Sequence, residues 1–195
     1  AKLITYILSG FMLLTLLVSV FSKEFVILMA KNPKFYGAYK VLPVIAFAYF
    51  FFGTYFLFLS GLMVAKKIYQ QPLILSAGAA VNIILNFILI PRYTMLGAAV
   101  SMLFAYLFVS LLTYKASQKR FFIPYEIKRI LCLILTAVLI FTLSTFLAGK
   151  NLIFNISMKA ALLVFFPFIL FVIFGSQNEK RFIRDFILSR LQRYP

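Results

Sequence analysis

The chain has 195 residues, of which 64% are hydrophobic and only 12% charged, and its mean hydropathy is +1.04. A soluble domain carries roughly 25% charged residues, so this composition excludes an ordinary water-soluble protein. The net charge of +16 would suit a nucleic-acid partner. However, the basic residues lie mainly between apolar runs, where they set membrane topology, and we expect no nucleic-acid binding.

Six apolar runs succeed one another along the chain. Each is long enough to cross a bilayer as a helix, which takes about 20 residues, and too long for barrel strands of about 10 residues. The runs cover residues 3–22, 42–65, 73–90, 95–114, 130–148 and 153–174. The predicted fold class is an all-α polytopic membrane protein with about six transmembrane helices, surrounded by membrane lipids.

The chain starts at Ala1-Lys2 without an initiator methionine, which fits a fragment or a processed chain. The first apolar run is too long for the hydrophobic region of a signal peptide. After it, residues 23–40 include an apolar stretch too short to span, and Pro33 and Gly37 interrupt the helical pattern beyond that stretch. We expect a short helix or a re-entrant segment at the outer surface there.

The run at residues 73–90 carries two amides, Asn82 and Asn86, in otherwise apolar sequence. On a helix they share one face with Gly78. The next run carries a stripe of small residues at the same spacing, Gly97, Ser101 and Ala105. Because a buried amide needs a hydrogen-bond partner, two interpretations stay open. The amides either form hydrogen bonds between helices or line a wet path and contact a substrate.

The last two apolar runs contain three residues that suggest local roles only. Cys132 is the one cysteine, so no disulfide within the chain and no metal site are expected. Lys159 lies near the outer end of the final run, and we expect it to snorkel to water, with ligand binding as the alternative. Pro167 predicts a kink.

Residues 175–195 form a tail in which apolar and basic residues recur at helical spacing. This pattern predicts a basic amphipathic helix on the inner leaflet, with a solvated helix as the alternative. Six spans place both ends on one side, and the basic residues of the tail favour cytoplasmic ends. Without Lys2 and the tail, the two sides carry equal numbers of basic residues.

The run LSAGAAVNIILNFILIPRYTMLGAAVSMLFAYLFVSLLTY, residues 75–114, resembles the C-terminal half of the polysaccharide transporter family. That family contains the O-antigen and exopolysaccharide flippases, and its superfamily also includes multidrug antiporters and lipid II flippases. The similar features are a span with paired asparagines ending in Ile-Pro, a Gly-Ala-Ala opening of the next helix, and the aromatic AYLFV segment. The resemblance covers most of the chain and is strongest over residues 42–130.

The resemblance implies a two-lobed fold in which this chain corresponds to the C-terminal part and the N-terminal lobe is missing. It implies movement of an undecaprenyl-diphosphate-linked oligosaccharide across the bacterial cytoplasmic membrane by alternating access. Asn82 and Asn86 would contact sugar hydroxyls. Four basic residues would attract the diphosphate, or would simply set the topology: Lys66, Lys67, Lys119 and Arg120.

Two other functions compete with this one. A related exporter of drugs or lipid II is the main alternative, although a cation-coupled antiporter would be expected to carry a membrane-embedded carboxylate, and these runs carry none. A membrane enzyme is not expected, because acid–base or metal chemistry needs His, Asp or Glu at the site. The chain has no histidine, and its four acids lie outside the apolar runs: Glu24, Glu126, Glu179 and Asp185. We therefore expect no catalytic residues, no metal and no cofactor.

Overall fold

The computed structural model describes residues 2–30, 32–120, 123, 125–146 and 152–174. These residues are nearly all helical and include no strand, which confirms the all-α prediction for this part of the chain. The tail at residues 175–195, and the amphipathic helix predicted there, lie outside the described residues.

Eight helical elements succeed one another in the described residues. They are α1 (Lys2–Val20), α2 (Ser22–Met29), the 3-10 helix η1 (Pro33–Lys40), α3 (Leu42–Val64), the 3-10 helix η2 (Ile68–Gln70), α4 (Gln71–Arg120), α5 (Ile127–Phe146) and α6 (Leu152–Phe174). The short α2 and η1 occupy the connection in which the sequence predicts a short helix.

Four of the helices with described residues are long and apolar enough to cross a membrane, namely α1, α3, the helix containing α4, and α5. In α6, the described residues contribute a shorter apolar segment, Asn155–Pro167. Several long apolar helices fit a multi-pass membrane protein. The count of six spans stays a prediction.

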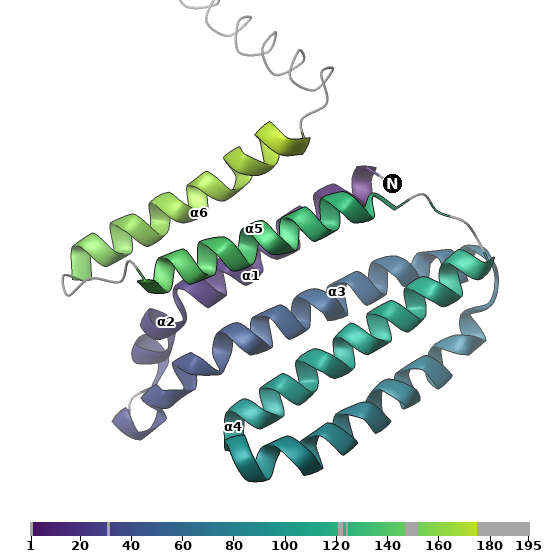
Figure 1. The fold of residues 1–195 in the computed structure, drawn as a ribbon, viewed down its shortest axis with the longest axis horizontal. Coiled ribbons are helices and arrows are strands. Elements are labelled where there is room, and N and C mark those ends of the chain that lie inside the picture. The colour runs from purple at the N-terminus through teal and green to yellow at the C-terminus, as the bar shows by residue number, and fades with distance from the viewer. Residues whose placement is uncertain (1, 31, 121–122, 124, 147–151, 175–195) are drawn as a thin grey trace, which may run out of the picture.

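Helix α4 has 50 residues and reverses direction at Thr94, whose backbone angles are φ 50° and ψ −120°. The reversal comes shortly after Pro91, which has no N–H to donate to a helix. Residues 71–93 form a first limb and residues 95–120 a second limb, which folds back along it (Figure 1). The two apolar runs predicted at residues 73–90 and 95–114 therefore lie on the two limbs of one hairpin.

Glycine at position 97 makes this tight reversal possible. A Cβ at Gly97 would collide with the backbone carbonyl of Leu89 on the first limb. A backbone group cannot rotate away as a side chain can, so the two limbs can approach this closely only where the side chain is absent.

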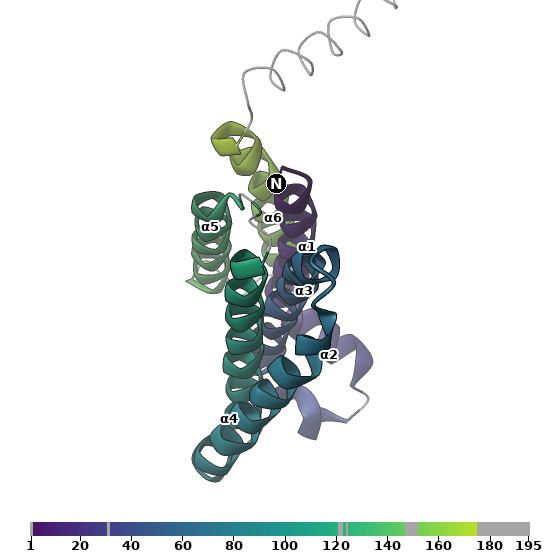
Figure 2. The ribbon, with the colours of Figure 1, turned by 90° about the vertical axis from the view of Figure 1, so that its right-hand side faces the viewer.

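The helices bury two separate clusters. The larger one joins α1, α3, α5 and α6, and on α1 it uses Leu8, Met12, Leu16 and Val20, whose spacing of four places them on one helix face. The smaller one joins α3 to α4 through Tyr55, Leu59, Leu62, Ile74 and Val109. Helix α3 contributes to both clusters and lies between α1 and α4 (Figure 1). In the turned view, α5 and α2 lie on opposite sides (Figure 2).

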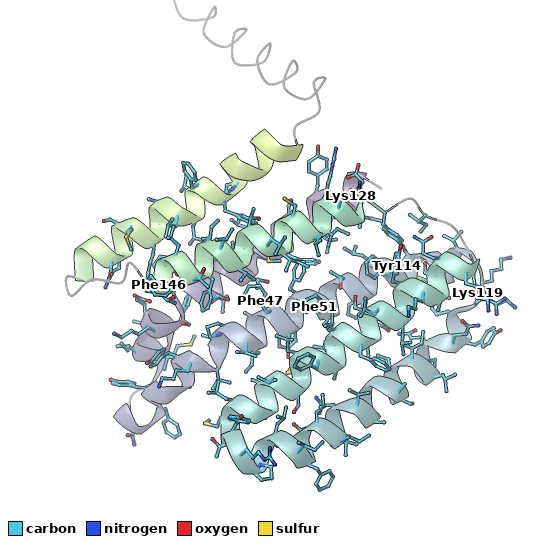
Figure 3. All side chains as sticks on the ribbon, viewed as in Figure 1. Phe47, Phe51, Tyr114, Lys119, Lys128 and Phe146 are labelled. Carbon is cyan, nitrogen blue, oxygen red and sulfur yellow. The ribbon has the colours of Figure 1, made fainter. Side chains whose placement is uncertain are left out.

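The helices run back and forth, so that basic residues gather at two ends. Lys119 and Lys128 lie at one end and Phe146 at the other (Figure 3). Lys23, Lys40 and Lys159 all line one pocket together with residues near the end of α5, which places them at the Phe146 end. The end that faces the cytoplasm stays a prediction.

Candidate functional site

The two amides predicted to share a helix face do so on the first limb of α4. Asn86 Nδ2 donates a hydrogen bond to Asn82 Oδ1 at 2.8 Å. Both residues are half-buried. The Oδ1 atom of Asn86 is buried and accepts no hydrogen bond from any described residue. The pair therefore keeps one buried acceptor without a partner, and further N–H donors.

A groove of about 470 Å³ runs between the two limbs of α4. Asn82 lies in its wall, together with small residues such as Gly78 and Ala105 and with Tyr106 from the second limb. A Cβ at Gly78 would collide with the side chain of Val109, so the limbs approach closely there. Small side chains thus leave a groove beside a close helix contact, and its wall carries an amide and a phenol.

Asn86 lies beside a second hollow rather than in this groove. That hollow has a volume of about 370 Å³ and is lined by Ile83, Asn86, Phe87, Ile90 and Pro91. Asn82 in the groove and Asn86 in the second hollow are thus joined by their hydrogen bond along the first limb. A polar ligand that occupies the groove would meet Asn82 first.

The interpretation that these amides join two helices does not describe the bond they form, because that bond links neighbours on one limb. Hydrogen bonds between helices occur elsewhere. Thr54 Oγ1 and Ser110 Oγ lie 2.6 Å apart, and Gln71 Nε2 donates to the Tyr55 hydroxyl at 2.8 Å. These bonds join α3 to α4, and the sequence pattern did not identify them.

The four basic candidates lie at one end of the molecule, where α3 meets η2 and α4 ends. Lys66 adopts a left-handed conformation with φ 54°. Its N–H donates to the carbonyl of Met63 at 3.0 Å, and that of Lys67 donates to the carbonyl of Leu62 at 2.9 Å. These two bonds close a Schellman motif at the end of α3. The backbone at Lys66 therefore has a structural role.

Lys67, Lys119 and Arg120 complete this basic end. The Nζ atom of Lys67 lies 5.5 Å from the centroid of the Tyr69 ring, a cation–π contact. Lys119 and Arg120 are exposed at the end of the second limb. Asn82 lies about 16 Å along the first limb from Gln71 at 1.5 Å per residue. The structure thus brings the basic candidates to one end but does not bring the amides to them.

The environment predicted for Lys159 is wrong. This lysine is only 8% exposed, and its Nζ donates to Glu24 Oε1 at 2.6 Å. It pairs with an acid from α2 instead of snorkelling to water. The sequence carried one indication of this ion pair, because Glu24 and Lys159 were both expected near the outer ends of apolar runs.

A second acid also connects distant parts of the chain. Glu126 Oε2 accepts hydrogen bonds from Thr5 Oγ1 and from an Nη atom of Arg129, each at 3.0 Å. These contacts join α1 to the start of α5. Among the described residues, no group of three or more His, Cys, Asp or Glu side chains could hold a metal ion.

Comparisons of the chain with protein-family models, with curated proteins and with solved structures found no match. The fold and the candidate site therefore identify the general class of this protein and no particular family. It is a helical protein with several helices able to cross a membrane, one of which folds into a hairpin that encloses an amide-bearing groove.

Proposed function

We propose that this chain is the C-terminal part of a flippase that moves a lipid-linked oligosaccharide across the bacterial cytoplasmic membrane by alternating access. The observation that carries the proposal is the amide pair of α4, with Asn82 in the wall of the groove between the limbs and Asn86 with a buried, unused acceptor. The undecaprenyl-diphosphate-linked repeat unit of a surface polysaccharide is the proposed substrate.

A glycan headgroup cannot enter hydrocarbon without partners for its hydroxyl groups. Each sugar hydroxyl both donates and accepts, as a primary amide does. The amide of Asn82 carries both functions in the wall of the groove, inside an apolar helix. Small residues beside it, such as Gly78 and Ala105, leave room for a ring. The arrangement supports binding and passage of a polar group, and requires no bond to be made or broken.

The first limb is also suited to movement and to contact with a second lobe. Only Ile74 and Gly78 are buried on it, while Leu73 is 75% exposed and Phe87 is 80% exposed. In such transporters two lobes rock about a site between them. The proposed N-terminal lobe would face this exposed limb, and the groove would open or close as the lobes move.

The diphosphate of the substrate has a proposed partner at the basic end. Lys66, Lys67, Lys119 and Arg120 would concentrate an anionic headgroup at the entrance through their combined field. Setting the topology is a second role that the same charges can have.

The test uses Asn82→Leu and Asn86→Leu in the full-length protein, expressed in cells that lack their own flippase. Asn82→Leu should reduce surface polysaccharide with little loss of folded protein, and it should have the larger effect, because Asn82 lies in the groove. Thr142→Leu is the matched control, since Thr142 is an exposed polar residue on α5, away from the limb proposed to face the second lobe. It should leave flipping unchanged.

Two outcomes would count against the proposal. One is unchanged polysaccharide in Asn82→Leu. The other is loss of folded protein in proportion to the loss of polysaccharide, which would indicate a structural role worth about 0.6 to 1.7 kcal/mol per hydrogen bond. Measuring drug resistance and lipid II export in the same cells separates the alternative exporters from a polysaccharide flippase.

A further inference from the structure

A pocket of about 530 Å³ lies among α1, α3, α5 and α6, at the end of the molecule opposite Lys119 and Lys128. Three lysines line it, Lys23, Lys40 and Lys159, and none of the described residues in its lining is an acid. Its wall also carries hydroxyl groups, including those of Ser22 and Thr145. A cavity lined by ammonium and hydroxyl groups is suited to an anion.

Lys159 distinguishes this pocket from an ordinary solvated lysine surface. Its side chain is 10% exposed, so the ammonium group is largely removed from water. It donates to Glu24 Oε1 at 2.6 Å and lies 5.8 Å from the centroid of the Phe21 ring. An ammonium group has three donors. The bond to Glu24 uses one of them, while the residue also lines the pocket.

Glu24 offsets only part of the positive charge. It is the acid bonded to Lys159, it is absent from the pocket lining, and its Oε2 atom accepts no hydrogen bond from a described residue. Lys23 and Lys40 are exposed at the rim and add two charges. A phosphate group carries a charge of about −1.5 to −2 and three strong acceptor oxygens, which matches the remaining charge and donors.

We propose that this pocket binds a phosphate-bearing anion, with Lys159 as the buried contact and Lys23 and Lys40 at its rim. The anion is either free phosphate or diphosphate, or the headgroup phosphate of an anionic lipid, because both reach a pocket at the end of a membrane helix bundle. The proposal goes beyond the transport of oligosaccharide and does not depend on it.

Glu24 and the anion compete for the same ammonium group. Removing the charge of Glu24 should therefore strengthen anion binding, while removing Lys159 should weaken it. A purely structural ion pair makes a different prediction, since loss of either partner leaves the other charge buried and unpaired. Both variants would then be less stable, with no opposite change in anion affinity.

The experiment titrates the full chain, purified in a neutral detergent, with inorganic diphosphate and, separately, with short-chain phosphatidylglycerol. A ligand that binds the folded state raises the unfolding temperature as its concentration rises. Stabilisation by diphosphate identifies a site that takes a free anion. Stabilisation by phosphatidylglycerol alone identifies a lipid-headgroup site. Either result supports the proposal.

The variants locate the binding. Lys159→Gln should weaken the apparent affinity roughly tenfold, the loss expected for a charged hydrogen bond, and Glu24→Gln should strengthen it. Lys128→Gln, an exposed lysine at the other end, is the matched control and should bind as the unmodified chain does. If Lys159→Gln does not fold, the double variant Glu24→Gln with Lys159→Gln removes both charges of the ion pair and should bind more weakly than Glu24→Gln alone.

Three results would overturn the proposal. The first is no stabilisation by either anion. The second is unchanged affinity in Lys159→Gln, or the same affinity in the double variant as in Glu24→Gln. The third is equal weakening by Lys128→Gln, which would show that the anions act through general charge screening.

Discussion

The two sides of α3 are built on different principles. On one side, α1, α5 and α6 present large apolar side chains, and Leu133 and Phe166 are fully buried. On the other side, the second limb of α4 presents a stripe of small and hydroxyl residues, in which Ser101, Thr113 and Ser117 are fully buried. Helix α3 thus contributes to the larger apolar cluster on one side, and on the other side to the smaller apolar cluster together with a close contact of small and hydroxyl residues.

The difference arises from the forces that hold helices together in lipid. Apolar side chains gain little by leaving lipid for a protein core, so association depends on close packing and on hydrogen bonds. Small residues permit that approach, and their hydroxyls bond to the carbonyl four residues earlier, as Ser101 does to Gly97 and Thr113 to Val109. Other small residues of α4, among them Gly78, Ala98 and Ala105, line the groove between its two limbs, so the candidate site lies on this side.

Among the variants that test the two sides of α3, Gly97→Ala should change the unfolding free energy most. A methyl group there would meet the carbonyl of Leu89, and overpacking against backbone should cost about 3 kcal/mol of unfolding free energy. The matched control is Gly10→Ala, since nothing lies within 4 Å of a Cβ at Gly10. It should gain up to about 1 kcal/mol through helix propensity. Denaturant unfolding in detergent measures the change in unfolding free energy in both variants. If Gly97→Ala and Gly10→Ala change it in the same direction, the close-packed hairpin is contradicted.

Leu133→Ala tests the apolar side. Leu133 is fully buried, and its truncation should cost about 2 kcal/mol, the lower end of the range for buried leucines. The lower end is expected because lipid removes most of the transfer contribution and leaves the loss of packing. Leu135→Ala, at a position 58% exposed on the same helix, should change the unfolding free energy much less. If both cost the same, the apolar cluster is not a packed core.

A double-mutant cycle on Thr54 and Ser110 measures the polar side directly. Their hydroxyls lie 2.6 Å apart between α3 and α4. Thr54→Val with Ser110→Ala should show a coupling of about 0.6 kcal/mol, the average for hydrogen bonds between membrane helices. Thr142, which is exposed and bonds to its own helix at Val138, gives the control cycle with Ser110. The control cycle should show no coupling. If its coupling energy equals that of Thr54 and Ser110, the hydrogen bond between α3 and α4 is not the source of the coupling.

The smallest effect is expected from pH, at Tyr125 between α4 and α5. Burial raises the pKa of its phenol above the usual 10.0, and the hydroxyls of Ser117 and Ser60 oppose the shift. The folded state therefore holds the proton more tightly than the unfolded state. The resulting stability is present below about pH 10 and is lost as pH rises through the folded-state pKa.

Tyr125→Phe should reduce this loss of stability in alkali, measured as unfolding free energy against pH. A pH profile that is the same in Tyr125→Phe as in the unmodified chain would contradict the assignment.

Local features of this protein are determined by the sequence alone. Apolar run length predicts the helices because a backbone in lipid must satisfy its own hydrogen bonds, and the runs at residues 42–65 and 130–148 correspond to α3 and α5. The spacing of four places Asn82 and Asn86 on one face, as their mutual hydrogen bond confirms. Both features depend on near neighbours in the chain.

Contacts between distant residues were decided only by the tertiary structure. Glu24 meets Lys159 across 135 positions and Thr5 meets Glu126 across 121, and no local pattern specifies such pairs. The sequence placed Lys159 near a helix end, where snorkelling and ion pairing are both open to a lysine. The approach of α2 to α6 selected the ion pair. Which amide lines the groove was likewise set by how the second limb of α4 folds back on the first, because helical spacing identifies a shared face but not the surface that it meets.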